Sequence, residues 1–182
     1  MILKGKFQFL SLFFLLFSSV SYAQSSPEYP KHAFIWPLDI NPEIVANFGE
    51  LRANHFHMGF DCRTAQKQNL PVYAVADGYI SRIKIEPQGF GRAIYIDHPN
   101  GYTTLYAHLN DFFPELEQYV KEQQYKLKSW AIDLRFTPNQ FTVEKCRFIA
   151  YSGNTGASQG PHVHFEIRDT KTEKAQNPAL FG

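Results

Sequence analysis

Alternating hydrophobic and polar positions dominate the sequence from residue 36 onward. The stretches 72–76 and 79–85 are rich in strand-forming residues, and the Asp-Gly pair between them is typical of a tight hairpin turn. The same alternation recurs over 92–98 and 102–109, on either side of a Pro-Asn-Gly turn, which predicts a second hairpin. The pattern therefore predicts short antiparallel strands.

One segment breaks the alternation. Between residues 111 and 130 the apolar positions recur every three or four residues, and Pro114 lies near the start, where a first-turn proline is tolerated. This spacing predicts one helix, which interrupts the run of strands. The fold class that follows is mainly β, an antiparallel sheet or sandwich with one helical insertion.

The last predicted strand covers residues 162–168. Successive side chains of a strand point to opposite faces, so this strand has one apolar face and one polar face. The apolar face carries Val163, Phe165 and Ile167, and the polar face carries His162, His164, Glu166 and Arg168.

The first 23 residues have the pattern of an export signal. Lys4 and Lys6 precede an apolar run over 7–17, and a Ser-Tyr-Ala sequence offers small residues before the expected cleavage after Ala23. The run is shorter than the ~20 apolar residues that a bilayer requires. We expect a signal peptide over 1–23, no stable membrane insertion after cleavage, and a mature protein in the periplasm or outside the cell.

The rest of the chain is expected to form a lead-in segment over 24–35 and a single domain over 36–182. The 182 residues include 18 Lys and Arg against 17 Asp and Glu, with a formal net charge of +1. These charges are scattered and form no basic stripe, so nucleic acid is excluded as a partner. An oxidising compartment would permit a disulfide between Cys62 and Cys146, but two isolated cysteines are more often small core residues.

Histidines gather where the predicted elements end. His162 and His164 share one strand face, and His57 and Asp61, four apart, can share a face on a strand or a helical turn. Imidazole and carboxylate are ligands that Zn²⁺ accepts in catalytic sites, where three protein ligands leave a fourth position open. The sequence thus contains the parts of a catalytic metal site.

Other sites are less well supported. A cupin-like barrel site also uses two histidines on a strand, but it expects a glutamate several residues downstream, whereas Glu166 follows His164 by two. The helical His-Glu-x-x-His signature is absent from the sequence. His32 and His98 stand apart from the other histidines, and both are expected to be solvated or capping residues.

Several motifs, in order along the chain, are similar to those of the lysostaphin/LytM-type zinc metallopeptidases, metallopeptidase family twenty-three. The resemblance extends over about residues 36–182. It is carried by Asn47-Phe48-Gly49, His57-Met58-Gly59-Phe60-Asp61, Tyr106-Ala107-His108-Leu109, Ser152-Gly153-Asn154-Thr155-Gly156 and Gly160-Pro161-His162-Val163-His164-Phe165-Glu166.

The resemblance implies roles for five residues. His57, Asp61 and His164 match the ligands of one zinc ion, and His162 and His108 match the two other histidines that handle the attacking water and the developing charge. His162 is the first choice for general base and His108 for orienting water or stabilising the oxyanion, and the two roles could be exchanged. His55 has the same parity as His57, and the family's glycine two residues after the ligand selects His57.

The resemblance also implies a fold and an activity. The expected fold is the lysostaphin-like duplicated hybrid motif, and the expected activity is that of a secreted zinc metalloendopeptidase that cleaves peptide cross-links of bacterial peptidoglycan. Gly-Gly and D-amino-acid cross-links both stay open as substrates. The alternative is a non-catalytic member of the same fold that binds the wall or activates another hydrolase.

Two features depart from the family pattern. Cys146 and Arg147 stand where a turn Gly-Asp is common, which puts the local turn in doubt. The segment 110–139 is longer than the minimal family core and resembles an insertion of a secreted Gram-negative subgroup, whose members often carry further domains. The chain is therefore read as a possible fragment of a longer protein.

Overall fold

The computed structural model describes residues 28–182, so the expected signal peptide and the start of the lead-in lie outside it. Within these residues the chain forms a nine-stranded sheet, with the path β1-β2-β11-β6-β5-β4-β8 and with β12 and β9 beside it, and a three-stranded sheet β3-β10-β7. All strand pairs are antiparallel. The strands are β1 (Ile44–Ala46), β2 (Phe60–Arg63), β3 (Pro71–Tyr73), β4 (Gly78–Ile85), β5 (Arg92–Asp97), β6 (Tyr102–Ala107), β7 (Leu109–Phe112), β8 (Ile132–Arg135), β9 (Thr142–Val143), β10 (Phe148–Ser152), β11 (His162–Asp169) and β12 (Ala175–Gln176).

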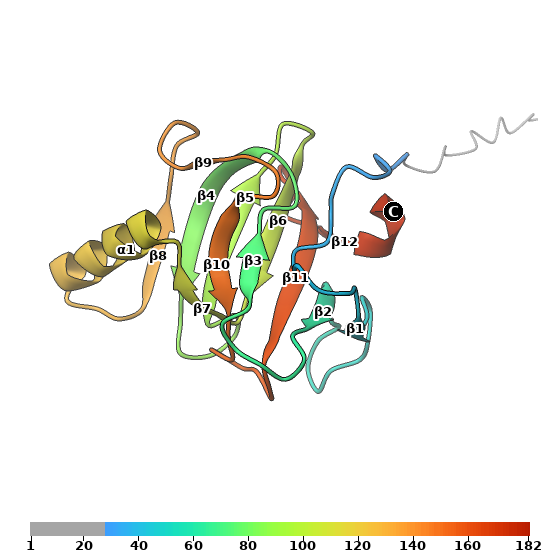
Figure 1. The fold of residues 1–182 in the computed structure, drawn as a ribbon, viewed down its shortest axis with the longest axis horizontal. Helices are drawn as coiled ribbons and strands as arrows, with labels where there is room; N and C mark the ends of the chain where they lie inside the picture. Colours follow the sequence, from blue (N-terminus) through green and yellow to red (C-terminus); the bar gives the residue numbers. More distant parts are fainter. Residues whose placement is uncertain (1–27) are drawn as a thin grey trace, which may run out of the picture.

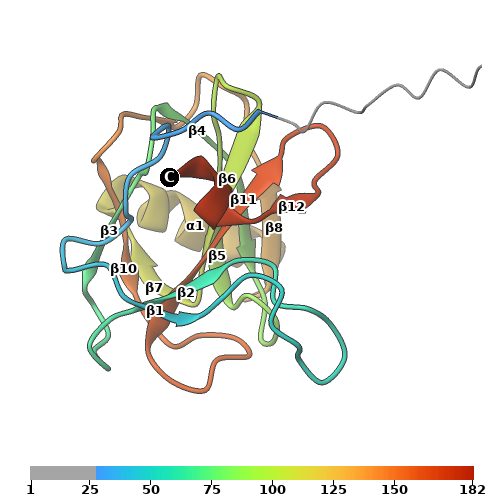
Figure 2. The same cartoon turned by 90° about the vertical axis from the view of Figure 1, so that its right-hand side faces the viewer.

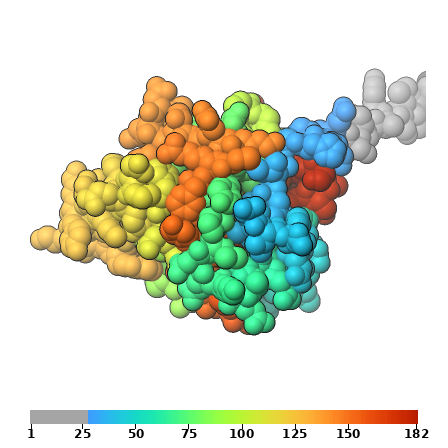
Figure 3. All heavy atoms as spheres, viewed as in Figure 1, coloured from blue at the N-terminus to red at the C-terminus, as the bar shows by residue number. Residues whose placement is uncertain are grey.

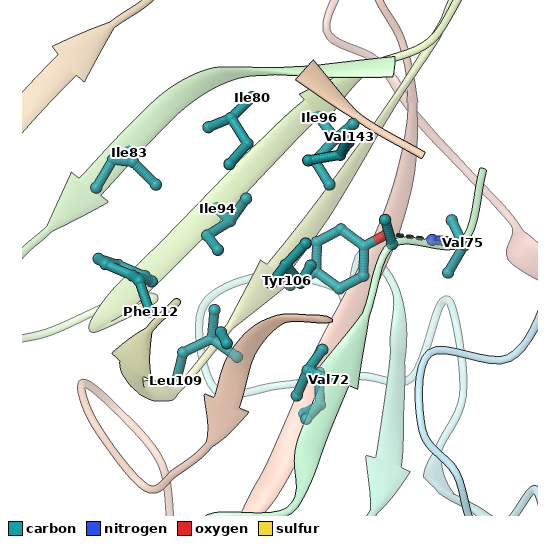
Figure 4. Packing of buried hydrophobic residues seen from close by; sticks show 14 of the residues in the cluster. Val72, Val75, Ile80, Ile83, Ile94, Ile96, Tyr106, Leu109, Phe112 and Val143 are labelled. Carbon is teal, nitrogen blue, oxygen red and sulfur yellow. Dashed lines mark hydrogen bonds between the residues drawn. The ribbon is translucent and has the colours of Figure 1, made fainter. Parts of the chain in front are cut away.

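The two sheets form layers, with the three-stranded sheet in front of the larger one in Figure 1. Apolar side chains from both sheets fill the space between them, and Figure 4 shows part of this core. Tyr106 is fully buried there, and its hydroxyl accepts a hydrogen bond of 3.0 Å from the backbone N–H of Val75. The sandwich expected from the alternating pattern is confirmed.

The first predicted hairpin is wrong. β3 pairs with β10 and β4 pairs with β5, β8 and β9, so the chain between β3 and β4 crosses from one sheet to the other. Gly78 serves a close approach instead of a turn, because a Cβ there would lie 2.3 Å from the carbonyl oxygen of Asp97. The Asp-Gly pair was misleading because glycine is favoured both in a tight turn and where a neighbouring backbone comes close.

The second hairpin is confirmed. β5 and β6 pair along their length, and Asp97 faces Thr103 next to the turn. β6 also pairs with β11, which is therefore an inner strand of the large sheet. Figure 2 shows β1 and β2 at one end of β11 and β12 at the other end.

The predicted helix is present as α1 (Pro114–Leu127), shorter at both ends than the range 111–130. Residues up to Phe112 belong to β7, and Lys128 ends the helix in a left-handed conformation with φ of 51°. The segment that follows adds β8 to the edge of the large sheet. In Figure 3 the helix stands out from one side of the molecule.

A short 3₁₀ helix, η1 (Pro178–Phe181), ends the chain. Across residues 28–182 no helix combines the length and the apolar character that crossing a membrane would take.

Candidate metal centre

The pairing of β2 with β11 brings together parts of the sequence that are about a hundred residues apart. In this pairing Asp61 and His164 face each other. His57 lies just before β2, in a loop where its backbone N–H donates to Glu50 and its carbonyl accepts from Gly49. Gly59 allows this loop to approach β11, because a Cβ at Gly59 would lie 2.2 Å from the carbonyl oxygen of Phe165.

Three side-chain atoms converge at this point. Nε2 of His57 lies 2.9 Å from Oδ1 of Asp61 and 2.9 Å from Nδ1 of His164, and the latter two atoms are 3.0 Å apart. The three residues form a group that could hold a metal ion. Tetrahedral zinc with bonds of about 2.0–2.1 Å would separate such atoms by about 3.3 Å, so small rotations of the side chains would accommodate it.

The outer nitrogen of each histidine fixes its tautomer. Nδ1 of His57 donates to the backbone carbonyl of Asn47 at 2.8 Å, and Nε2 of His164 donates to Oε1 of Glu166 at 2.8 Å. The inner nitrogens then present lone pairs toward each other and toward a carboxylate oxygen. Acceptors that face one another in this way require a cation between them, and a metal ion satisfies all three, whereas one proton satisfies two.

Asp61 carries the negative charge of the group. Burial raises the pKa of Asp61, but hydrogen bonds from His162, His164 and His57, which these rings donate when protonated, outweigh it and hold the pKa well below its usual range. Its other oxygen, Oδ2, accepts from Nη2 of Arg52 at 3.3 Å. This leaves Oδ1 as the oxygen that faces the histidines.

The pKa of His164 is shifted in the opposite direction from that of Asp61. Burial lowers its pKa, but hydrogen bonds with Asp61 and Glu166 outweigh it and raise the pKa above its ordinary value. The site is thus built to hold positive charge between these carboxylates.

Two further histidines lie beside the group. The rings of His108 and His162 are 4.7 Å apart, and Nε2 of His162 lies 3.4 Å from Oδ1 of Asp61. Nδ1 of His162 donates to the carbonyl of Gly160 at 2.8 Å, and Nδ1 of His108 donates to that of Thr155 at 2.8 Å. Nε2 of each ring is therefore left as a proton acceptor.

Burial, and after it the charge of the neighbouring His162, lower the pKa of His108 to about 4. At neutral pH the ring of His108 is uncharged. A neutral imidazole next to a cation site can take a proton or orient water.

The glycine-rich segment before β11 holds His108 in place. A Cβ at Gly91 would lie 2.3 Å from Oγ1 of Thr155, and that hydroxyl donates to the carbonyl of Leu109 at 2.9 Å. The glycines therefore allow this loop to lie against the β5 end of the sheet, where the carbonyl of Thr155 meets His108.

All five site residues expected from the sequence lie together, namely His57, Asp61, His108, His162 and His164. His55 is exposed and contacts Asn54 instead. His32 is exposed as expected, but the expectation for His98 is wrong. His98 is buried, and its two nitrogens form hydrogen bonds of 2.8 Å with the carbonyl of Asp77 and the hydroxyl of Thr104.

Sequence reasoning missed some supporting residues and one cysteine. Glu166 orients His164, and its place on the same strand face as His164 was the available signal. Arg52 stands in the loop before β2 and its guanidinium contacts Asp61. Both cysteines are free, Cys62 buried as expected of a core residue, but Cys146 exposed.

Comparisons with known proteins agree with these observations. A family model described as peptidase family M23 matches residues 55–125. The chain is 36% identical over 112 residues to the DD-carboxypeptidase/endopeptidase Mpg of Neisseria meningitidis serogroup B, which covers 62% of this chain and 20% of that protein. It is 30% identical over 159 residues to the murein hydrolase activator NlpD of Salmonella dublin, which covers 87% of this chain and 34% of that protein.

The fold has a solved counterpart. The catalytic domain of the antimicrobial peptidase lysostaphin from Staphylococcus simulans superposes with a TM-score of 0.57 at 22% identity, over 78% of this chain and 92% of that chain. The fold is therefore lysostaphin-like. The chain spans about a fifth of the length of the first curated relatives it matches.

Proposed function

Since the chain belongs to peptidase family M23, we propose that it is a zinc metalloendopeptidase that cleaves peptide cross-links of bacterial peptidoglycan. The observation that carries the proposal is the set of three acceptor atoms, on His57, Asp61 and His164, within 3.0 Å of one another. Two nitrogens and one carboxylate oxygen suit zinc and leave a coordination position for the substrate.

Zinc bound there would act as a Lewis acid, which makes water nucleophilic at neutral pH and polarises the scissile carbonyl. The protein residues supply the other functions. His57 and His164 hold their lone pairs inward because Asn47 and Glu166 take their outer N–H groups. Arg52 holds Oδ2 of Asp61, which keeps Oδ1 directed at the ion.

His162 and His108 are the candidates for proton transfer. Each has its Nδ1–H fixed on a backbone carbonyl, so each presents Nε2 to the reacting atoms. His162 lies nearer to Asp61 and is the first choice for the general base, which would take a proton from the attacking water. His108, neutral at pH 7, would orient that water or donate to the developing oxyanion once protonated.

The substrate class is supported by relatives. Mpg is named a DD-carboxypeptidase/endopeptidase, and the lysostaphin domain is named an antimicrobial peptidase. Export by the segment 1–23 would deliver the enzyme to the cell wall, in agreement with this substrate.

A second candidate is a non-catalytic activator of other wall hydrolases. It is favoured by the likeness to NlpD, named a murein hydrolase activator, over 87% of this chain. Against it, an activator needs neither the three inward acceptors nor the two neighbouring histidines.

Metal analysis with a hydrolysis assay tests the proposal. We expect one zinc per chain and release of peptides from purified peptidoglycan, and loss of both in His164→Ala, while the exposed-residue control His32→Ala keeps both. Chelation is expected to lower the melting temperature, because the ion joins the loop before β2 to β11. A zinc-free chain that releases nothing but stimulates a second hydrolase would replace the enzyme with the activator.

A further inference from the structure

A cavity of about 100 Å³ lies near the far end of β11 from the histidines. Its walls include Arg82, Arg135, Arg168, Tyr95 and Glu173. It is roughly an order of magnitude larger than the space one water molecule needs. The function proposed above makes no use of it.

The cavity opens on the same face of the sheet as the metal centre. Glu166 contacts both, since its Oε1 accepts from His164 at 2.8 Å and its Oε2 accepts from Nε of Arg168 at 2.6 Å. Arg168 follows His164 by four residues on one strand, which corresponds to about 13 Å. That distance is spanned by about four extended peptide residues, so one bound peptide can reach both places.

Hydrogen-bond donors in the cavity are left without acceptors. Among residues 28–182, no protein group accepts from the Nη groups of Arg168, which is half-buried, or from the guanidinium of Arg135, which is exposed to solvent. Arg135 stands directly opposite Arg82 across the β4–β8 pair. Like charges in that position repel unless an anion lies between or beside them, and Asp133 pairs with Arg82 only.

One acceptor is also free. Glu173 is exposed and forms no side-chain hydrogen bond or close ion pair within the described part of the chain, although its charge helps to raise the pKa of Arg82 and of Arg168. Asp97 in the same wall accepts from Ser81 at 2.8 Å and from Thr103 at 2.7 Å. The arginines are further balanced by Asp133 and Glu166 outside the cavity. These acidic groups would repel a simple anion. The remaining guanidinium donors and the carboxylate of Glu173 together favour a ligand that carries both a negative and a positive charge.

We propose that this cavity binds a zwitterionic amino-acid head group, with an ammonium and a carboxylate on one carbon, at the end of a side branch of the peptide substrate. The carboxylate accepts from the free donors of Arg168 and Arg135, and the ammonium donates to Glu173. Tyr95, over which Arg82 and Arg168 both stack at 5.0 and 5.8 Å, forms the wall that orients the two guanidinium groups. This inference rests on the proposed function for its substrate, and it makes Arg135 and Glu173 specificity-determining residues.

Binding is tested first, without catalysis. Nuclear magnetic resonance titration of the intact, zinc-loaded protein with glycine should shift the backbone signals of Arg135 and Thr170 at millimolar concentrations, and acetate and methylammonium should shift them at least tenfold more weakly. Arg135→Gln and Glu173→Gln should abolish the glycine response, and Lys171→Gln, an exposed neighbour outside the cavity, should keep it. Equal responses to glycine and acetate, or a response retained in both variants, would overturn the proposal.

Catalysis then tests the link to the substrate. Two matched peptides are compared, one with a branch that ends in a free α-amino carboxylate and one with that carboxylate amidated. We expect KM to be about tenfold lower for the free form, and equal for the two forms in Arg135→Gln, with kcat unchanged. Glycine binding in a protein that cleaves neither peptide would overturn the enzyme proposal alone, whereas cleavage of both with equal KM would overturn the branch-binding proposal alone.

Discussion

Two buried polar clusters of this protein use similar groups in opposite ways. Around Glu117 every group has its complement, since the carboxylate accepts from Arg92 and from the backbone N–H of Phe112, and Arg92 also donates to the carbonyl of Asn110. Around Asp61 acceptors face acceptors, since the inner nitrogens of His57 and His164 both point at the carboxylate oxygen. The first cluster is closed and joins the helix to the sheet, whereas the second is complete only with a cation.

The largest expected effect falls on the cluster around Asp61, which we call the open cluster because it lacks its cation. His57→Ala removes one acceptor of the set, and we expect release of peptides from peptidoglycan to fall at least a thousandfold, because a Lewis acid contributes several kcal/mol to the transition state. The matched control is His55→Ala, two residues away, exposed and outside the cluster. Hydrolysis that survives His57→Ala would remove the distinction between the two clusters.

The closed cluster should respond in stability. Glu117→Ala leaves Arg92 and the N–H of Phe112 without their acceptor, and we expect the free energy of unfolding to fall by about 3 kcal/mol. Urea denaturation measures it, with Glu122→Ala on the exposed face of the same helix as the control. Zinc content should stay unchanged in both variants. If Glu117→Ala lowers the free energy of unfolding by less than about 1 kcal/mol, the cluster does not stabilise the packing of the helix on the sheet.

A residue at the edge of the open cluster should have an intermediate effect. Glu166→Gln keeps the shape of the side chain but removes the charge that orients His164, and we expect zinc affinity to fall about 10–100-fold. Competition with a chelating dye measures this, and Glu144→Gln, exposed and remote, is the control. An unchanged affinity would mean that the hydrogen bond to Glu166 does not support the metal.

His98 extends the comparison to pH. Both its nitrogens are satisfied and burial lowers its pKa below the ordinary value of 6.5. Protonation therefore favours the unfolded chain, so the stabilisation is present above about pH 6.5 and is lost as the pH falls toward the folded-state pKa.

Melting temperatures at pH 7.5 and pH 5 measure the effect. We expect His98→Gln to reduce the pH-dependent drop by about 2–4 °C relative to the wild type, and His32→Gln to leave it unaltered. If both variants keep the full drop, other groups are responsible for it.

The smallest effect concerns a turn with no buried group. Cys146 is exposed and has a φ of 69°, a left-handed conformation that costs a residue with a side chain roughly 1 kcal/mol or more. Cys146→Gly should raise the free energy of unfolding by about 0.5–1 kcal/mol, whereas Cys146→Ala should give no gain. Chemical denaturation decides, and an equal gain from both would exclude the backbone as its source.

The sequence was informative where a regular period fixes side-chain direction. The alternation in β11 placed His164 on the opposite face from Val163, and the turn between β5 and β6 followed from its own residues. The Asp-Gly pair before β4 was misleading, because the partners of β3 and β4 come from distant segments.

The same distinction holds at the site. The candidate ligand set was predicted from its motifs and its three residues do lie together, but the contact of Arg52 and the buried state of His98 depend on tertiary contacts that no local pattern encodes. At Cys146 the sequence misled, because the missing turn glycine put the local turn in doubt, yet the chain turns there and Cys146 adopts a left-handed conformation.

The pairing of β2 with β11 also sets when the chemistry can begin. The two histidines that face each other are 107 residues apart, and a slip of one residue in β11 would exchange His164 for Val163 or Phe165 at the site. A partly assembled chain therefore holds no complete set of acceptors. Metal binding would therefore report that the large sheet has reached its correct register.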